Sequence, residues 1–183
     1  MLRVLIFFFV SGAIFPLSWQ ALRDLRTHGF YRFFAFESLL GLVLLNAPVW
    51  FRDPLCARQM AAWLLGAVSI GLAIEGFRLL RVIGRPAPAA VPSANLAFEN
   101  TTKLVTVGAY RWIRHPLYAS LLALGWGAYL KDPLGGGSVA LVLVATGSLV
   151  ATALAEEREN ALRFGAAYSD YMKRTWRFVP FVF

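Results

Sequence analysis

The residues best suited to chemistry lie in segment 103–118, KLVTVGAYRWIRHPLY, which combines cations, aromatic rings and one of the chain's two histidines. Pro116 suits the first position of a helix, where its missing N–H would have no partner in any case. The free amides and positive dipole end of such a helix favour an anionic group. His115 and Tyr118 are spaced to share one helix face, and Gly108 permits a tight turn before them. The segment therefore predicts a pocket for a nucleotide-like cofactor.

A second candidate for chemistry is the carboxylate pair Glu156 and Glu157, which lies where a later apolar run ends. Adjacent carboxylates at that position are not needed for folding, and they could bind an amine, a ribose diol or a sulfonium. A solvated helix start explains the pair equally well. Likewise, a satisfied interfacial residue explains His115 as well as a ligand-binding role does. Residue types alone leave both interpretations open.

The composition of the chain indicates a membrane protein. Hydrophobic residues make up 58% of the 183 residues, charged residues only 15%, and the mean hydropathy is +0.60, whereas soluble domains have about 25% charged residues. The net charge is +8, but the cations lie between apolar blocks, which favours bilayer orientation over nucleic-acid binding. The single cysteine, Cys56, provides neither a disulfide framework nor a set of metal ligands.

Long apolar blocks predict an all-α, polytopic membrane protein with about five transmembrane helices. The first block could be a signal peptide, but its apolar character continues past Ala13 to Leu22, which favours a retained helix. The fifth block continues into an amphipathic segment that ends near Arg174 and is expected to form a C-terminal interfacial helix. The expected spans are 2–21, 33–50, 55–80, 116–130 and 138–155.

The chain is expected to form one integral-membrane domain, 1–183, with a three-helix part at 1–81 and a cofactor-binding part at 95–183. A polar gap with three prolines, 84–100, separates the two parts and is expected to be a loop. Within the third block, Glu75 lies one helical turn before Arg78, and an ion pair between them is expected.

Charge asymmetry predicts that the C-terminus, segment 103–118 and Glu156 face the cytoplasm. Five spans would place most cations on that side and few on the other. The cytoplasmic set is Arg23, Arg26, Arg32, Arg81, Arg85, Lys103, Arg111, Arg114, Lys173, Arg174 and Arg177, and the opposite set is Arg3, Arg52, Arg58 and Lys131.

Two motifs in the C-terminal part resemble those of the integral-membrane methyltransferases, which include isoprenylcysteine carboxyl methyltransferases and phosphatidylethanolamine N-methyltransferases. Together they cover residues 95–181, whereas the first three blocks are similar only in being hydrophobic. The first motif is Gly108-x-Tyr110-Arg111-x-x-Arg114-His115-Pro116-x-Tyr118. The second is Glu156-Glu157, followed by Phe164-Gly165-x-x-Tyr168-x-x-Tyr171, with Pro180 near the end of the chain.

The resemblance implies S-adenosyl-L-methionine as cofactor and a lipophilic acceptor that comes from the bilayer, such as a prenylcysteine carboxylate or a phospholipid amine. It implies direct SN2 methyl transfer without an assigned catalytic residue, and an amine would lose its proton to solvent or to a carboxylate such as Glu157. The implied cofactor positions are Thr102, Lys103, Leu104, Val105, Tyr110, His115, Pro116, Leu117, Tyr118 and Glu156. Asn95, Arg114 and Glu157 are further candidates.

The chain also departs from this family, and two other functions compete. Members often have histidine at the position of Thr102, and the prenylcysteine enzymes have arginine at the position of Thr152. Membrane sterol and steroid reductases, which use NADPH, carry an Arg-His-Pro-x-Tyr-like motif but lack the Glu156-Glu157 pair. A non-enzymatic membrane subunit on the same scaffold is the other alternative.

Overall fold

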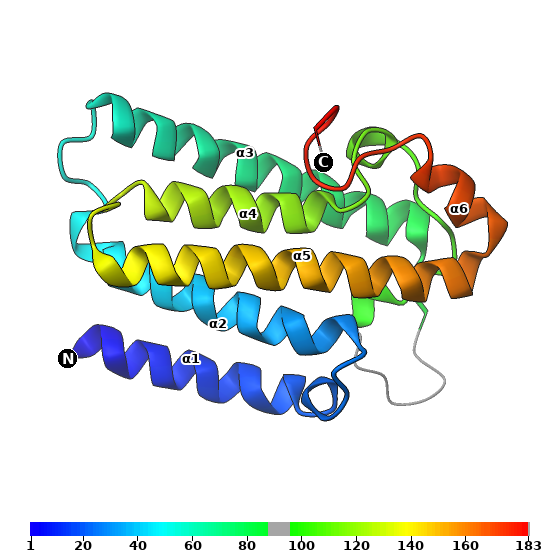
Figure 1. Cartoon of the computed structure of the whole chain (residues 1–183), viewed down its shortest axis with the longest axis horizontal. Coiled ribbons are helices and arrows are strands. Elements are labelled where there is room, and N and C mark those ends of the chain that lie inside the picture. Colours follow the sequence, from blue (N-terminus) through cyan, green and yellow to red (C-terminus); the bar gives the residue numbers. More distant parts are fainter. Residues whose placement is uncertain (88–95, 183) are drawn as a thin grey trace.

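The computed structural model describes residues 1–87 and 96–182, and this part of the chain is all-helical, without a β-strand. Two isolated bridges, Pro86 with Thr101 and Ile113 with Trp176, are its only extended pairings. The α-helices are α1 (Leu2–Ser18), α2 (His28–Asn46), α3 (Ala57–Leu79), α4 (Pro116–Tyr129), α5 (Gly136–Phe164) and α6 (Ala166–Met172) (Figure 1). The expected all-α fold is confirmed.

Three helical segments among the described residues are long and apolar enough to cross a membrane: His28–Val49, Ala57–Gly84 and Gly136–Phe164. The first two extend α2 by the turn Ala47–Val49 and α3 by the π-helical turn Leu80–Gly84. These three segments indicate a membrane protein. The apolar helix α1 has 17 residues and α4 has 14, so both are shorter than the roughly 20 residues of a typical span.

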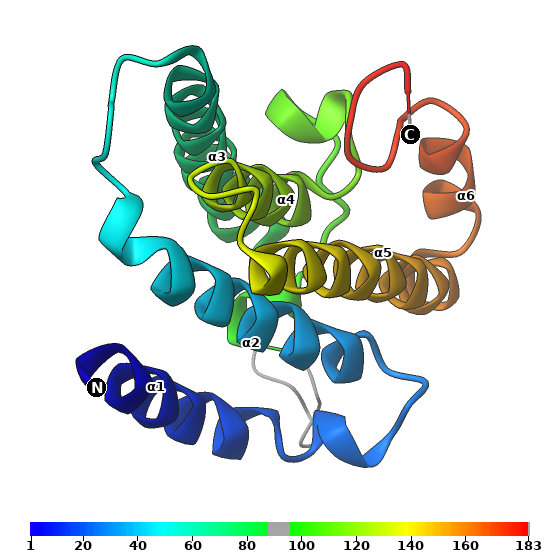
Figure 2. The same cartoon turned by 60° about the vertical axis from the view of Figure 1, so that its left-hand side comes forward.

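The helices pack side by side around α5, with α4 on one side of it, α2 on the other, and α1 outside α2 (Figure 2). Small side chains permit close packing: Ala35 of α2 and Ala153 of α5 are fully buried with Leu149. The same core includes Ile113 and Phe178 from the segments before α4 and after α6. The N-terminal and C-terminal parts therefore share one core, and the tail belongs to it.

The connections between the helices lie at the two ends of the bundle. Figure 1 shows the α1–α2 connection, the segment before α4 and helix α6 at one end, with the α2–α3 and α4–α5 turns at the other. The second end is closed by polar contacts: Lys131 Nζ donates to Gln59 Oε1 at 2.8 Å, and Ser138 Oγ donates to Asn46 Oδ1 at 3.0 Å. The segments with the predicted site residues thus gather at the first end.

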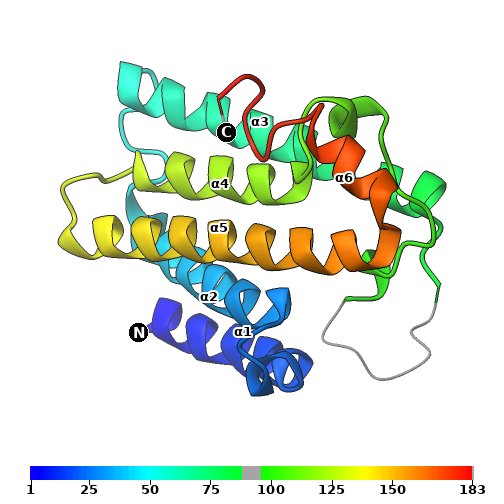
Figure 3. The same cartoon turned by 45° about the vertical axis from the view of Figure 1, so that its right-hand side comes forward.

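The C-terminal amphipathic segment differs from the expected unbroken helix. Helix α5 runs to Phe164, and Gly165 then has a positive φ of 59°, a conformation that glycine adopts without the Cβ penalty. The short α6 therefore turns back toward the segment before α4 (Figure 3), where the Tyr171 hydroxyl donates to the Tyr110 carbonyl at 2.6 Å.

Glu75 also has a different partner from the one expected. Its Oε1 accepts the backbone N–H of Ala109 at 2.9 Å, whereas no ion pair with Arg78 is found among the described residues. Gly108 makes this contact possible, because it has φ 59° and a Cβ there would lie 2.5 Å from Glu75 Oε1. Glu75 thus fixes the turn that begins the segment before α4.

Gly108→Ala is expected to destabilise the protein by about 1–3 kcal/mol, because strained backbone and a clash with Glu75 combine. Thermal unfolding in detergent measures the effect. Gly165→Ala has the same φ but no atom within 4 Å, and Gly147→Ala has neither problem. The loss of stability should be largest for Gly108→Ala, smaller for Gly165→Ala and smallest for Gly147→Ala. Equal losses for Gly108→Ala and Gly165→Ala would show that the contact with Glu75 is unimportant.

Candidate functional site

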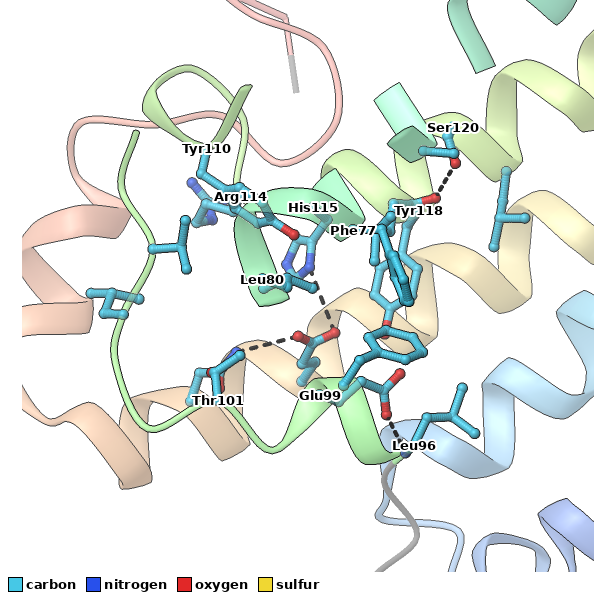
Figure 4. Close-up of a pocket in the computed structure, with 18 of the residues that line it drawn as sticks. Phe77, Leu80, Leu96, Glu99, Thr101, Tyr110, Arg114, His115, Tyr118 and Ser120 are labelled. Carbon is cyan, nitrogen blue, oxygen red and sulfur yellow. Dashed lines mark hydrogen bonds and ion pairs between the residues drawn. The ribbon is translucent and has the colours of Figure 1, made fainter. Parts of the chain in front are cut away.

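A cavity of about 490 Å³ lies between the helices at the end of the bundle where the predicted site residues gather (Figure 4). Sites for small molecules typically occupy about 300–1,000 Å³. Helices α2 to α6 and segment 96–105 all contribute to its wall. The predicted residues that line it are Leu104, Val105, Tyr110, Arg114, His115, Leu117, Tyr118 and Glu156.

The other predicted residues lie outside the lining of this cavity. The Thr102 hydroxyl donates to the Arg85 carbonyl at 2.9 Å, and the side chain of Lys103 is exposed. Pro116 is buried at the first position of α4, as its residue type predicts. Glu157 lies behind the cavity wall. Asn95 falls outside the described residues.

His115 is the N-cap residue of α4, and its ring contributes to the cavity wall (Figure 4). The ring stacks on Tyr118 with a centroid distance of 5.4 Å and an interplanar angle of 17°, in agreement with their spacing. Its Nε2 lies 3.3 Å from Glu157 Oε1, and its Nδ1 lies 3.7 Å from Glu156 Oε2. The imidazole is thus held between the two carboxylates of the second motif.

Glu157 joins the C-terminal tail to the segment before α4. Arg114 Nε donates to it at 2.8 Å, and Arg177 donates from Nη2 at 2.9 Å and from Nε at 3.1 Å. The two backbone segments also pair, since the Arg114 amide donates to the Trp176 carbonyl at 2.7 Å and the His115 amide to the Arg177 carbonyl at 3.2 Å. The tail is therefore a structural part of the site.

Glu156 faces a different way from its neighbour because successive residues of an α-helix are rotated by roughly 100°. It lines the cavity, and its side chain is 25% exposed. Apart from His115, it contacts the Tyr118 side chain through a hydrogen bond and Asn160 Nδ2 at a longer distance of 3.4 Å. Its carboxylate can therefore accept further hydrogen bonds from a ligand.

Arg32 and Glu99 form a second charged group at the cavity wall, which was not predicted from the sequence. Arg32 of α2 donates to both carboxylate oxygens of Glu99, and both residues line the cavity. His28 lies between two carboxylates, with Nε2 3.3 Å from Glu99 and Nδ1 2.7 Å from Glu159. These contacts hold the turn around Glu99 against α2 and α5.

Glu99 is ionised despite being nearly buried. Burial by itself would raise the pKa of the carboxyl group, but the hydrogen bond from His28 and the charge of Arg32 outweigh it and lower the pKa below its usual value. The only sequence signal for this group was an acidic residue in the gap 84–100, and nothing in the pattern links it to Arg32.

Most of the remaining cavity wall is apolar, and α2, α3 and α4 contribute much of it. It includes Phe36, Ala73, Phe77 and Leu121. Ile74 also lines the cavity, although 65% of this residue is exposed on the surface of α3. The apolar wall thus reaches the outer surface of a helix long and apolar enough to span a membrane.

A second, smaller cavity of about 60 Å³ adjoins the first, with room for water molecules. It shares Glu99, Glu156 and Asn160 with the larger cavity, and His28, Glu159 and Arg163 complete its lining. The smaller cavity thus adjoins the polar side of the larger one.

Comparison of the chain with protein-family models, curated proteins and solved structures identified no match.

Proposed function

We propose that this protein is an S-adenosyl-L-methionine-dependent methyltransferase that acts on a lipophilic acceptor. One observation carries the proposal: the two motifs that resemble the membrane methyltransferases meet at one cavity. Tyr110, His115 and Tyr118 line it from the first motif, and Glu156, Phe164 and Tyr168 line it from the second. A structural role for either motif would not require this meeting.

The polar part of the cavity suits the proposed cofactor. Glu156 has free capacity for a ribose diol or an amine, and the rings of Phe164, Tyr168 and Tyr171 offer an apolar wall for adenine. The first-turn amides of α4 can receive a carboxylate. When bound, the cofactor supplies the methyl group as an electrophile. The chain then contributes orientation and exclusion of water.

The apolar part of the cavity suits the acceptor. A lipophilic molecule can reach Phe36, Phe77 and Leu121 from the bilayer past the exposed Ile74. The smaller cavity also reaches Glu156 and is lined by polar and charged side chains, and we propose that the cofactor approaches from this side. The acceptor and the cofactor would thus approach from opposite environments, which favours this function over that of a non-enzymatic subunit.

We further propose that α1 and α4 complete five membrane crossings, with α6 at the cytoplasmic interface. The cation-rich connections lie at one end of the bundle, which the positive-inside rule places in the cytoplasm. A reporter fused after Phe183 should then give a cytoplasmic signal, and one fused in the α4–α5 turn a signal from the opposite side. Signals from the same side would contradict five crossings.

Glu156→Gln is expected to weaken the binding of S-adenosylhomocysteine at least about tenfold, because a hydrogen bond to a charged group contributes about 1.5–3 kcal/mol. Isothermal titration calorimetry measures this on purified protein. Asp170→Asn is the control, because that carboxylate is 61% exposed on α6. Wild-type protein that binds NADPH but neither S-adenosyl compound would overturn the proposed function.

A further inference from the structure

The His115 ring has one nitrogen toward the fully engaged carboxylate of Glu157 and the other toward Glu156, which lines the cavity. Glu157 Oε1 lies 3.3 Å from Nε2, and Glu156 Oε2 lies 3.7 Å from Nδ1. The side chain of His115 is 3% exposed, and it lines the cavity. Stacking on Tyr118 keeps the plane of the ring in place. The two nitrogens therefore have different roles.

Glu157 is placed to orient the ring and not to receive a proton from a ligand. It does not line the cavity, and two guanidinium groups, those of Arg114 and Arg177, donate to its oxygens. Arginine stays charged in proteins, so this carboxylate stays ionised. A carboxylate fixed beside one imidazole nitrogen keeps the proton on that nitrogen. The lone pair of His115 is then on Nδ1.

We propose that His115 is the proton acceptor for methyl transfer to an acceptor whose nucleophile carries a proton: an amine, hydroxyl or thiol. Glu157 is the positioning residue behind it. Glu156 is too far from Nδ1 for a hydrogen bond, so it does not occupy the lone pair of that nitrogen, and its charge stabilises the imidazolium that forms. The proposal rests on the proposed function and adds to it a catalytic residue and an acceptor class.

The proposed step is balanced. The acceptor heteroatom forms a bond to the methyl carbon while the carbon–sulfur bond breaks, and the electron pair of that bond stays on sulfur. The proton of the heteroatom moves to His115 Nδ1 and later to water. The charged groups that face the ring are Glu156, Glu157 and, through Glu157, Arg114 and Arg177. A carboxylate acceptor carries no proton and would not need His115.

Nitrogen-15 NMR of the imidazole rings in detergent tests the geometry without any cofactor. The chain has 2 histidines, so His115→Asn identifies the signals of His115 by removing them. The expected result is that the neutral ring carries its proton on Nε2. A neutral ring with its proton on Nδ1 would overturn the proposal.

Methyl transfer to amine-bearing lipids, measured with saturating labelled cofactor, tests the catalytic role. Asparagine suits an N-cap position but cannot act as a base, so the turnover number of His115→Asn should fall about 100- to 10,000-fold. An unchanged turnover number with weaker binding of S-adenosylhomocysteine would make His115 a cofactor ligand only, and the proposed function would survive. A wild-type protein that binds no S-adenosyl compound would overturn both.

Discussion

Glu157→Ala is expected to destabilise the protein by about 3–5 kcal/mol, since removal of one partner from a buried ion pair leaves the other charge uncompensated. Arg114 is 8% exposed and would lose its carboxylate, and Arg177 would lose the same partner. The Arg114 side chain also donates to the Thr175 carbonyl, so its displacement should loosen the tail. Binding of S-adenosylhomocysteine should fall as well, because His115 loses its orientation.

Two measurements check this result. The midpoint of thermal unfolding reports stability, and limited trypsin digestion reports whether Arg177, whose side chain is 17% exposed, becomes accessible. Asp170→Ala removes a carboxylate from an ion pair with Lys173 in which both side chains are exposed, 61% and 74%, and such pairs contribute only about 0–1 kcal/mol. If Glu157→Ala loses no more stability than Asp170→Ala, the tail is held by its backbone hydrogen bonds and its apolar contacts.

Arg32→Leu is expected to cost a similar amount, about 3–5 kcal/mol, because it leaves Glu99 charged in a nearly buried place. The double variant Arg32→Leu/Glu99→Leu should lose less stability than the two single variants lose when added together. In the double variant two apolar side chains replace both charges, so neither charge is left without its partner. Thermal unfolding of all four proteins completes the cycle. Additive losses, with no coupling between the two sites, would contradict the ion pair.

The same pair predicts a pH dependence. The pKa of Glu99 is lowered in the folded protein from the usual 4.5, so the unfolded chain takes up the proton first as the pH falls. The stability that this carboxylate contributes is therefore complete above pH 4.5 and is lost as the pH falls below that value. Glu99→Gln should lack this component of acid destabilisation. A Glu99→Gln profile parallel to that of the wild type would mean that Glu99 is unperturbed.

Two groups of ion pairs support the site, and the cavity lies between them. The first support is Glu157 with the C-terminal tail, behind His115. The second is Arg32 with Glu99, which holds the turn opposite. The turn held by the second support also contacts the apolar wall, because the ring of Phe98 lies 5.2 Å from that of Phe77.

The sequence was sufficient for the features that depend on local chemistry. Apolar blocks placed two helices within two residues: the third block was expected at 55–80 and α3 is Ala57–Leu79, and the fourth at 116–130 and α4 is Pro116–Tyr129. The second block was less accurate, expected at 33–50 where α2 is His28–Asn46. Pro116 begins its helix and His115 stacks on Tyr118, because both depend on backbone geometry over one turn. The two motifs also indicated a third of the residues that line the cavity: Tyr110, Arg114, His115, Tyr118, Glu156, Phe164, Tyr168 and Tyr171.

Only the tertiary structure decided which distant groups meet. Arg32 and Glu99 are 67 residues apart, and no periodicity connects them, because their contact depends on how α2 packs against a loop. The same reason applies to Glu75, which bonds Ala109 and not the nearby Arg78. It also applies to Glu156 and Glu157: adjacent in sequence, they are divided by the rotation of α5, so that one faces the cavity and the other holds the tail.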